Sequence, residues 1–248
     1  MIEIQNLHHR FADGTRALSG IDLTVPDGEL LLICGPNGSG KTTLIRHING
    51  LLKPSSGRIV VDGLDASLAT AEVRRRVGMV FQDADSQIVG ETVWEDVAFG
   101  PENLGLDSER INARVLSALQ MVGLEDHAEK PCHLLSGGEK RRLAIAGVLA
   151  LEPTIVIFDE PFANLDYTGT RQVLHQIVSL NQQGRTVVVT THDVEKIIAH
   201  VDRIVILQSG QVKVQGSPER VAPELSKHQI RPPCYSILGG RMISWLSD

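Results

Sequence analysis

The stretch LLLICGPNGSGKT, residues 30–42, decides the fold. Residues 30–34 form a continuous apolar run, as expected of a strand that is buried on both faces. Residues 35–42 match the pattern G-x-x-x-x-G-K-[ST], and we predict a helix from Lys41 to about Leu51. A buried strand, a glycine-rich loop and a helix in this order indicate a phosphate-binding loop (P-loop) in an α/β fold.

Each part of the P-loop suits a nucleotide. Its glycines let backbone N–H groups turn toward one anion, and the helix N-terminus adds a favourable dipole. Lys41 supplies positive charge to the β- and γ-phosphates, and the Thr42 hydroxyl is a ligand for Mg²⁺. An incidental glycine-rich turn would explain neither the strand nor the helix. We therefore expect the ATP contacts to come from Asn37, Gly38, Ser39, Gly40, Lys41, Thr42 and Thr43.

Further strands and helices are predicted outward from the loop. Buried runs at Thr154–Phe158 and Thr186–Thr190, with a helix over Thr168–Asn181 between them, indicate a parallel α/β core. Residues Ile2–Val25 predict short strands with turns, because apolar and polar residues alternate there. The remaining predicted strands are Arg58–Val61, Val77–Phe81 and a hairpin over Arg203–Val214.

Helices dominate the middle of the chain. The pattern is mainly helical from about Glu91 to Val122, with breaks predicted at Gly100-Pro101 and at Gly105. A further helix is predicted over Lys140–Ala150. The stretch from about Pro223 onward is poorly patterned, so we expect a loosely structured appendage there.

Two carboxylates, Asp159 and Glu160, follow a buried run. Ligands gather at the carboxyl ends of strands in open α/β sheets. Asp159 is therefore expected to hold Mg²⁺, and Glu160 to act as general base toward the attacking water. The pair alone could equally cap the next turn, but a P-loop in the same chain favours the catalytic interpretation.

Composition narrows the classes of function. The chain has 248 residues, 42% of them hydrophobic, which permits a sizeable core, and its net charge of -6 gives no support to nucleic-acid binding. Three scattered cysteines argue against a disulfide framework or a zinc site and fit a reducing compartment. The polar N-terminus does not resemble a signal peptide, and no apolar stretch is long enough to span a bilayer.

A second glycine-rich helix start lies at residues 135–139, LSGGE. Ser136 and Glu139 fit the S-x-x-E capping box. Gly137 and Gly138 leave backbone amides bare, so the same helix start could bind a γ-phosphate. The spacing of these residues alone favours the capping box over a γ-phosphate site.

The P-loop, Asp159-Glu160 and LSGGE together resemble the ATP-binding-cassette (ABC) ATPases over about Ile2–Val221. The resemblance implies an α/β fold with a P-loop NTPase core (a mostly parallel sheet flanked by helices), an N-terminal antiparallel β subdomain and a helical subdomain. It implies an ABC ATPase domain at residues 1–222, with its helical subdomain at about 83–150, and a short appendage at 223–248. It also implies a head-to-tail dimer, in which Ser136, Gly137, Gly138 and Glu139 of one subunit close over ATP on the other. Glu139 replaces the family's Gln, a change that the capping box tolerates.

Four more positions fit the family. Phe11 resembles the aromatic residue that stacks on adenine, and Gln82 the residue that contacts Mg²⁺ and the water. His192 resembles the switch histidine at the γ-phosphate, and residues 164–166 the D-loop that crosses the dimer interface. The resemblance thus implies ATP and Mg²⁺ as cofactors, with Glu160, His192 and Gln82 as catalytic residues and Thr42, Gln82 and Asp159 at the metal.

Residues 82–103, QDADSQIVGETVWEDVAFGPEN, resemble the energy-coupling-factor (ECF) ATPases, although Ala84 stands where that pattern often has Pro. This implies uptake of cobalt, nickel or a vitamin from a position at the cytoplasmic face of the cell membrane. The implied partners are a transmembrane coupling protein, a substrate-capture membrane protein and a second ATPase subunit, either identical or paralogous, with no nucleic acid.

The same segment, over Gln82–Asp96, is predicted to form a groove for a cytoplasmic helix of the membrane partner, with Val89 as an apolar anchor. An ordinary surface helix would show the same periodicity, with Val93 and Val97 packed on the core. Two other functions stay open. One is the ATPase of another ABC importer class, and the other is a non-transport ABC ATPase, which the single P-loop and the negative charge disfavour.

Overall fold

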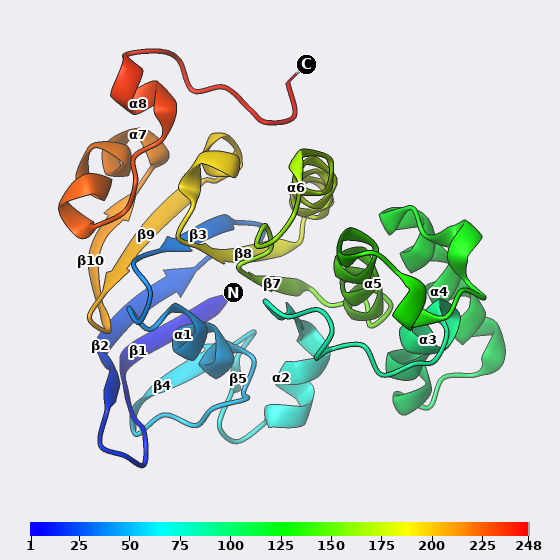
Figure 1. Ribbon diagram of the computed structural model, residues 1–248. Coiled ribbons are helices and arrows are strands. Elements are labelled where there is room, and N and C mark those ends of the chain that lie inside the picture. Colours follow the sequence, from blue (N-terminus) through cyan, green and yellow to red (C-terminus); the bar gives the residue numbers. More distant parts are fainter. Residues whose placement is uncertain (248) are drawn as a thin grey trace.

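The computed structural model describes residues 1–247 and contains two sheets (Figure 1). The smaller sheet is antiparallel, in the order β2-β1-β4-β5. Its strands are β1 (Ile2–Arg10), β2 (Arg16–Val25), β4 (Ser56–Val61) and β5 (Leu64–Asp65). The antiparallel N-terminal subdomain predicted from the family resemblance is therefore present.

The larger sheet carries the P-loop and has the order β10-β9-β3-β8-β7-β6. All neighbouring strands are parallel except the antiparallel pair β9 and β10. The strands are β3 (Leu30–Cys34), β6 (Val77–Val80), β7 (Ile155–Asp159), β8 (Thr186–Thr191), β9 (Arg203–Gln208) and β10 (Gln211–Gly216). Asp159 ends β7, while the P-loop follows β3 and His192 follows β8, so the three meet at the carboxyl edge of neighbouring parallel strands.

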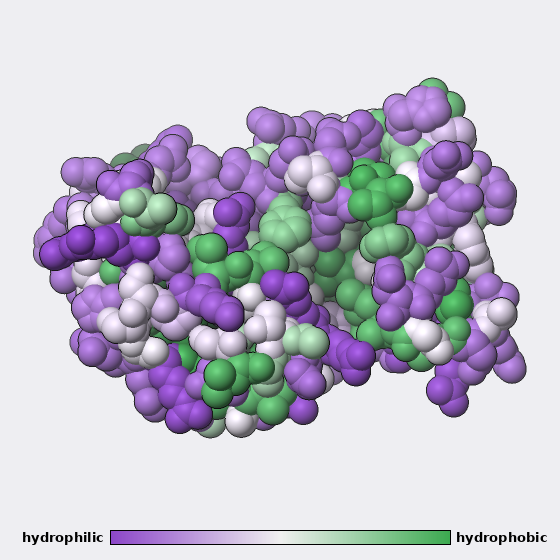
Figure 2. Space-filling view, turned by 90° about the horizontal axis from the view of Figure 1, so that it is seen from below, coloured by the Kyte–Doolittle hydropathy of each residue, from purple (hydrophilic) through white to green (hydrophobic). Residues whose placement is uncertain are grey.

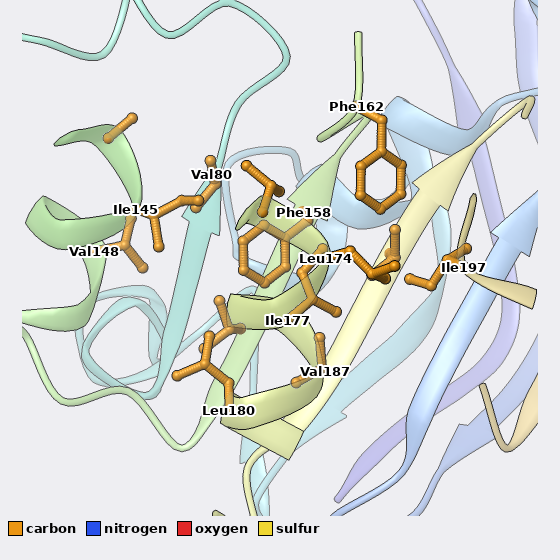
Figure 3. Packing of buried hydrophobic residues seen from close by; sticks show 14 of the residues in the cluster. Val80, Ile145, Val148, Phe158, Phe162, Leu174, Ile177, Leu180, Val187 and Ile197 are labelled. Atoms are coloured by element: carbon orange, nitrogen blue, oxygen red, sulfur yellow. The ribbon is translucent and has the colours of Figure 1, made fainter. Parts of the chain in front are cut away.

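Alternate residues of β3 enter two different cores, which explains its unbroken apolar run. Leu31 and Ile33 join the cluster shared with the antiparallel sheet and α1 (Lys41–Ile48). Leu30 and Leu32 join the second cluster, which includes α6 (Tyr167–Gln182). Figure 3 shows Phe158 of β7 packed near Leu174 and Ile177 of α6 in this second core.

A helical lobe lies to one side of the sheets (Figure 1). It contains α3 (Val93–Asn103), α4 (Ser108–Val122) and α5 (Gly137–Leu149), while α2 (Thr70–Arg76) leads into β6. The break predicted at Gly105 is confirmed by its φ of 69° just beyond α3. The lobe packs on the second core through buried residues that include Val93, Val97 and Leu143.

The break predicted at Gly100-Pro101 is wrong, because α3 runs through both residues. Pro101 lies near the last turn, where its missing N–H removes only one helical hydrogen bond. Gly100 serves packing instead: a Cβ there would lie 2.8 Å from Leu151 Cδ2. This glycine therefore marks a close approach of α3 to Leu151 and not a chain break.

The C-terminal stretch is better packed than the sequence predicts. It contains α7 (Pro218–Val221), a 3₁₀ helix at Ala222–His228 and α8 (Cys234–Leu238). Leu225 and Ile230 are buried in the second core, and Trp245 packs against it with its ring 5.6 Å from Tyr167. The prediction of a loosely structured appendage is therefore wrong for these residues. The sequence does not reveal their packing, because the buried residues are isolated along the chain and show neither a helical nor a strand period. The division at residue 222 stays a prediction.

Shorter 3₁₀ helices complete the chain at Glu125–His127, Cys132–Leu134, Val194–Lys196 and Ile198–His200. Cys34 and Cys132 are buried and Cys234 is exposed, and all three are free thiols. Within residues 1–247, none of the helices has the length and apolar character needed to cross a membrane.

Candidate functional site

The P-loop between β3 and α1 forms a cradle of backbone amides. Gly38 and Gly40 have φ values of 76° and 104°, which favour glycine, and a Cβ on Gly35 would lie 2.1 Å from the Leu207 carbonyl oxygen. Gly40 is the N-cap of α1, and no side chain caps this helix start. The first amides of α1 are therefore free to bind an anion.

Lys41 lies inside this cradle. Its Nζ donates to the carbonyl oxygens of Gly35 at 2.8 Å and Pro36 at 3.3 Å, and it lies 3.9 Å from Glu160 Oε1. Burial lowers the pKa of Lys41, while the carboxylates of Glu160 and Asp159 act in the opposite direction. The ammonium is thus held between the phosphate cradle and the acidic pair.

The two predicted metal ligands Thr42 and Asp159 are in contact. Asp159 Oδ2 accepts a hydrogen bond from Thr42 Oγ1 at 3.0 Å, and its Oδ1 accepts one from Thr190 Oγ1 at 2.6 Å. A carboxylate and a hydroxyl at this spacing are hard oxygen donors of the kind that Mg²⁺ prefers. These residues therefore fit a magnesium ion beside the P-loop.

Glu160 adopts a left-handed backbone conformation with φ of 47°, which is rare for a residue with a side chain. Its N–H donates to the Thr190 carbonyl oxygen at 2.9 Å. Its carboxylate accepts from Thr191 Oγ1 at 3.0 Å and from the His192 N–H at 3.1 Å, and His192 Nδ1 lies 3.0 Å from Oε1. The end of β8 thus holds both the backbone and the carboxylate of Glu160.

A cavity of about 430 Å³ brings most of the predicted residues together. Its walls include the P-loop, Phe11, Gln82, Glu160 and His192. A neighbouring cavity of about 610 Å³ shares Thr42 and Gln82 and extends to Asp159 and Gly137. Phe11, the P-loop and the acidic pair therefore line two adjoining cavities that share Thr42 and Gln82.

Sequence reasoning missed some residues of this site. Thr15, Arg16 and Ala17 line the 430 Å³ cavity from the start of β2. The turn residues Asp13-Gly14 before β2 predict a hairpin there, but they do not indicate that it borders a nucleotide site. Thr190 and Thr191, which orient the carboxylates, were predicted only as part of a strand.

The LSGGE segment forms the predicted capping box at the start of α5. Glu139 N donates to Ser136 Oγ at 3.3 Å, and Ser136 N donates to Glu139 Oε2 at 2.7 Å. This backbone hydrogen bond is the main cause that lowers the pKa of Glu139 to about 2, and Lys130 at 3.2 Å adds to it. Oε2 of the carboxylate therefore caps the helix while Oε1 binds Lys130, and no atom lies within 4 Å of the Cβ positions of Gly137 and Gly138, so a ligand can approach this helix start closely.

The structure does not bring this segment to the chain's own P-loop cavity. Of residues 1–247, the walls of the 430 Å³ cavity include neither Ser136, Gly138 nor Glu139, and Gly137 lines only the neighbouring one.

Known proteins resemble this chain in sequence and in fold. Residues 18–163 match the family model described as ABC transporter. The chain is 43% identical over 239 residues to the cobalt import ATP-binding protein CbiO of Rhodobacter capsulatus, covering 94% of this chain and 85% of that protein. It is 42% identical over 224 residues to the ECF transporter ATP-binding protein EcfA of Methanocaldococcus jannaschii, covering 89% of this chain and 80% of that protein.

A solved structure of similar fold is cbiO1 from Clostridium perfringens, described as part of the ABC transporter complex cbiONQ. It has a TM-score of 0.84 and 38% identity, with 96% of this chain and 98% of that chain covered. A bacterial ABC transporter cassette solved as a dimer has a TM-score of 0.79 and 32% identity, with 88% of this chain and 99% of that chain covered.

Proposed function

The chain belongs to the ABC transporter family of ATP-binding proteins, and we propose that it drives an ECF-type importer for cobalt, nickel or a vitamin. It is an ATPase with ATP and Mg²⁺ as cofactors. The cavity lined by the P-loop, Phe11, Gln82, Glu160 and His192 supports the ATPase activity, and the similarity to EcfA, CbiO and cbiO1 supports the ECF type.

The residues divide the chemistry as follows. Lys41 and the P-loop amides hold the phosphates, and Phe11 stacks on adenine. Thr42, Asp159 and Gln82 would hold Mg²⁺, which would supply positive charge to the phosphate oxygens. Glu160 takes a proton from the attacking water, and His192 keeps the Glu160 carboxylate in place and reaches the γ-phosphate.

The working unit is proposed to be a head-to-tail dimer with an identical or a paralogous subunit. Ser136, Gly137, Gly138 and Glu139 would close over ATP on the partner, because this helix start lies outside the chain's own P-loop cavity and the space beside Gly137 and Gly138 is open. A helix start with free N–H groups stabilises a phosphate, and the closed Glu139 cap leaves that function intact.

Ser136→Arg is expected to stop ATP-dependent dimerisation while leaving nucleotide binding intact. The larger side chain would occupy the helix start that must approach the partner's γ-phosphate. Size-exclusion chromatography with light scattering, done in ATP on a Glu160→Gln background, measures the dimer. Ser108→Arg, at the exposed start of α4, is the matched control. A Ser136→Arg variant that dimerises as well as this control would contradict the model.

Coupling to the membrane is proposed to use an apolar groove of about 410 Å³ between β6, α2, α3 and α5. Figure 2 shows hydrophobic side chains on both sides of a hollow between the two lobes. Val89 and Phe99, which line the groove, are 61% and 52% exposed, whereas Val93 is fully buried. An exposed apolar groove of this size suits an amphipathic helix of a transmembrane partner.

The groove is tied to the ATP site through its loop. Asp96 Oδ1 accepts hydrogen bonds from the Val89 N–H at 2.7 Å and the Gly90 N–H at 3.0 Å. Gln87, in the same loop, accepts from the Phe81 N–H at 3.0 Å, directly before Gln82. Movement of Gln82 would therefore be passed to the docking surface.

Val89→Asp is expected to weaken assembly with the membrane partner and to reduce transport, because truncating an anchor typically costs about 2 kcal/mol or more. Basal ATPase activity of the purified chain should change little, since Val89 lies outside the ATP cavity. Co-purification from membranes and ATPase assays measure the two effects. Leu68→Asp, at an exposed apolar residue outside the groove, is the control. Normal assembly would place the groove elsewhere, and a collapse of ATPase activity would make Val89 a structural residue.

Isolating the native complex tests the proposed function as a whole. We expect a transmembrane coupling protein, a substrate-capture membrane protein and a second ATPase subunit, with the chain peripheral to the cytoplasmic face of the membrane. A periplasmic-type binding protein in place of the capture protein would indicate another importer class. Nucleic acid or ribosomes without membrane proteins would indicate a non-transport ABC ATPase.

A further inference from the structure

A buried arginine, Arg141, joins α5, called here the signature helix because it begins at the LSGGE segment, to the loop that carries Gln82. Its Nη1 donates to the Phe81 carbonyl oxygen at 2.6 Å, and its Nη2 donates to the Gln82 carbonyl oxygen at 2.5 Å. Arg141 is only 5% exposed. The two arms of the guanidinium thus bind the two peptide groups that flank Gln82, and a planar fork fixes this geometry better than a single ammonium could.

The neighbouring residue Lys140 strengthens the link. Its Nζ lies 2.5 Å from Asp85 Oδ1, so two consecutive residues of α5 hold the loop at both ends. Arg141, Lys140 and Gln82 line the 610 Å³ cavity, and Gln82 also lines the 430 Å³ cavity with Glu160 and His192. The loop can therefore not shift far without moving with α5.

Arg141 lies five positions after Ser136, little more than one turn along the same helix. The start of this helix faces a partner's ATP in the proposed dimer, whereas Gln82 faces the chain's own ATP. A displacement of α5 on engaging the partner's phosphate is transmitted rigidly to Arg141. Releasing the loop would leave a buried guanidinium without its acceptors, which is costly.

We propose that Arg141 is a positioning residue that couples the two ATP sites, because it carries movement of the signature helix to Gln82. This inference rests on the proposed dimeric ATPase. Its consequence is that hydrolysis at one site depends on ATP at the other, so the rate rises cooperatively with ATP concentration.

The test is steady-state ATP hydrolysis by the full chain across a range of ATP concentrations, with binding of a fluorescent ATP analogue measured in parallel. The wild type should show a Hill coefficient approaching about 2, the number of sites. Arg141→Gln should lower kcat about tenfold, a loss typical of removing charge-assisted hydrogen bonds, and bring the Hill coefficient to about 1. Analogue affinity should stay within about twofold, since ground-state binding is untouched.

Two further variants separate positioning from general stability. Arg141→Lys keeps the charge but only one donor group, so kcat and the Hill coefficient should lie between those of the wild type and Arg141→Gln. Arg114→Gln removes another partly buried arginine of the helical lobe, which donates to the Ala150 carbonyl oxygen and pairs with Glu152. It should behave as the wild type.

Wild-type kinetics in both Arg141 variants would overturn the inference and leave the proposed function standing. An equal loss in Arg114→Gln would do the same, because it would indicate a general effect on the lobe. If Arg141→Gln fails to fold, Arg141→Lys decides by the same measurements. An inactive wild type would overturn the proposed function, and this inference with it.

Discussion

Glu160→Gln is expected to bind ATP but to hydrolyse it about 10²–10⁴ times more slowly than the wild type, the usual cost of losing general-base catalysis. The amide keeps the shape of the carboxylate: its one oxygen can still accept from the His192 N–H, and its NH₂ group can donate to the Thr191 hydroxyl. It cannot take a proton from water. The backbone at this position, with φ of 47°, should be unaffected because the side chains differ only at their ends.

An ATP-bound dimer should accumulate in this variant, since hydrolysis is the step that opens it. Light scattering after size-exclusion chromatography detects the dimer, and phosphate release measures the rate. Glu109→Gln, at an exposed residue in the first turn of α4, is the control for loss of one negative charge. If Glu160→Gln stays monomeric in ATP and hydrolyses at the wild-type rate, both the base assignment and the dimer model are wrong.

The core of the fold could be predicted because its strands are buried on both faces. The apolar runs that became β3, β7 and β8 have no polar alternation, so they indicated a parallel sheet with covering helices. The order of strand, P-loop and helix then placed Lys41 and Thr42 at the carboxyl edge. The capping box at Ser136 and Glu139 was equally readable, because both of its hydrogen bonds are local in sequence.

What could not be predicted depends on contacts between distant segments. Gly100 is a glycine because Leu151 packs closely against it, but Leu151 is remote in sequence. The sequence pattern therefore indicated a helix break instead of a close contact. The packing of Ile230 and Trp245 shows no period, so nothing in their spacing revealed it. The grip of Arg141 on the carbonyls of Phe81 and Gln82 spans about sixty residues, and carbonyl acceptors leave no trace in a sequence pattern.

The sequence predicted which residues carry the chemistry of the site, but not the hydrogen-bond partners that hold them in position. Asp159 and Glu160 were identified from their place after a buried strand, yet the hydroxyls of Thr190 and Thr191 that orient them belong to another strand. The left-handed backbone of Glu160 is stabilised by these contacts and not by its own preference. Roles assigned to the carboxylates therefore remain predictions that the variants must test.

Lys41→Ala is expected to abolish ATP turnover. Lys41 supplies the P-loop's ammonium, which lies 2.8 Å from the Gly35 carbonyl oxygen and 3.9 Å from Glu160 Oε1, between the cradle and the proposed base. Without it, charge on the β- and γ-phosphates loses its protein cation, and the acidic pair Asp159 and Glu160 repels the nucleotide unopposed. Mg²⁺-dependent phosphate release measures the loss, with EDTA as the blank.

The fold should survive this change, because alanine is the best helix former and α1 keeps its buried residues Leu44, Ile45 and Ile48. Thermal unfolding of the variant checks this. Lys53→Ala, at an exposed lysine just beyond α1, controls for the loss of a positive charge and should retain full activity. Near wild-type hydrolysis by well-folded Lys41→Ala would overturn the phosphate-site assignment, since no other lysine lines the 430 Å³ cavity within residues 1–247.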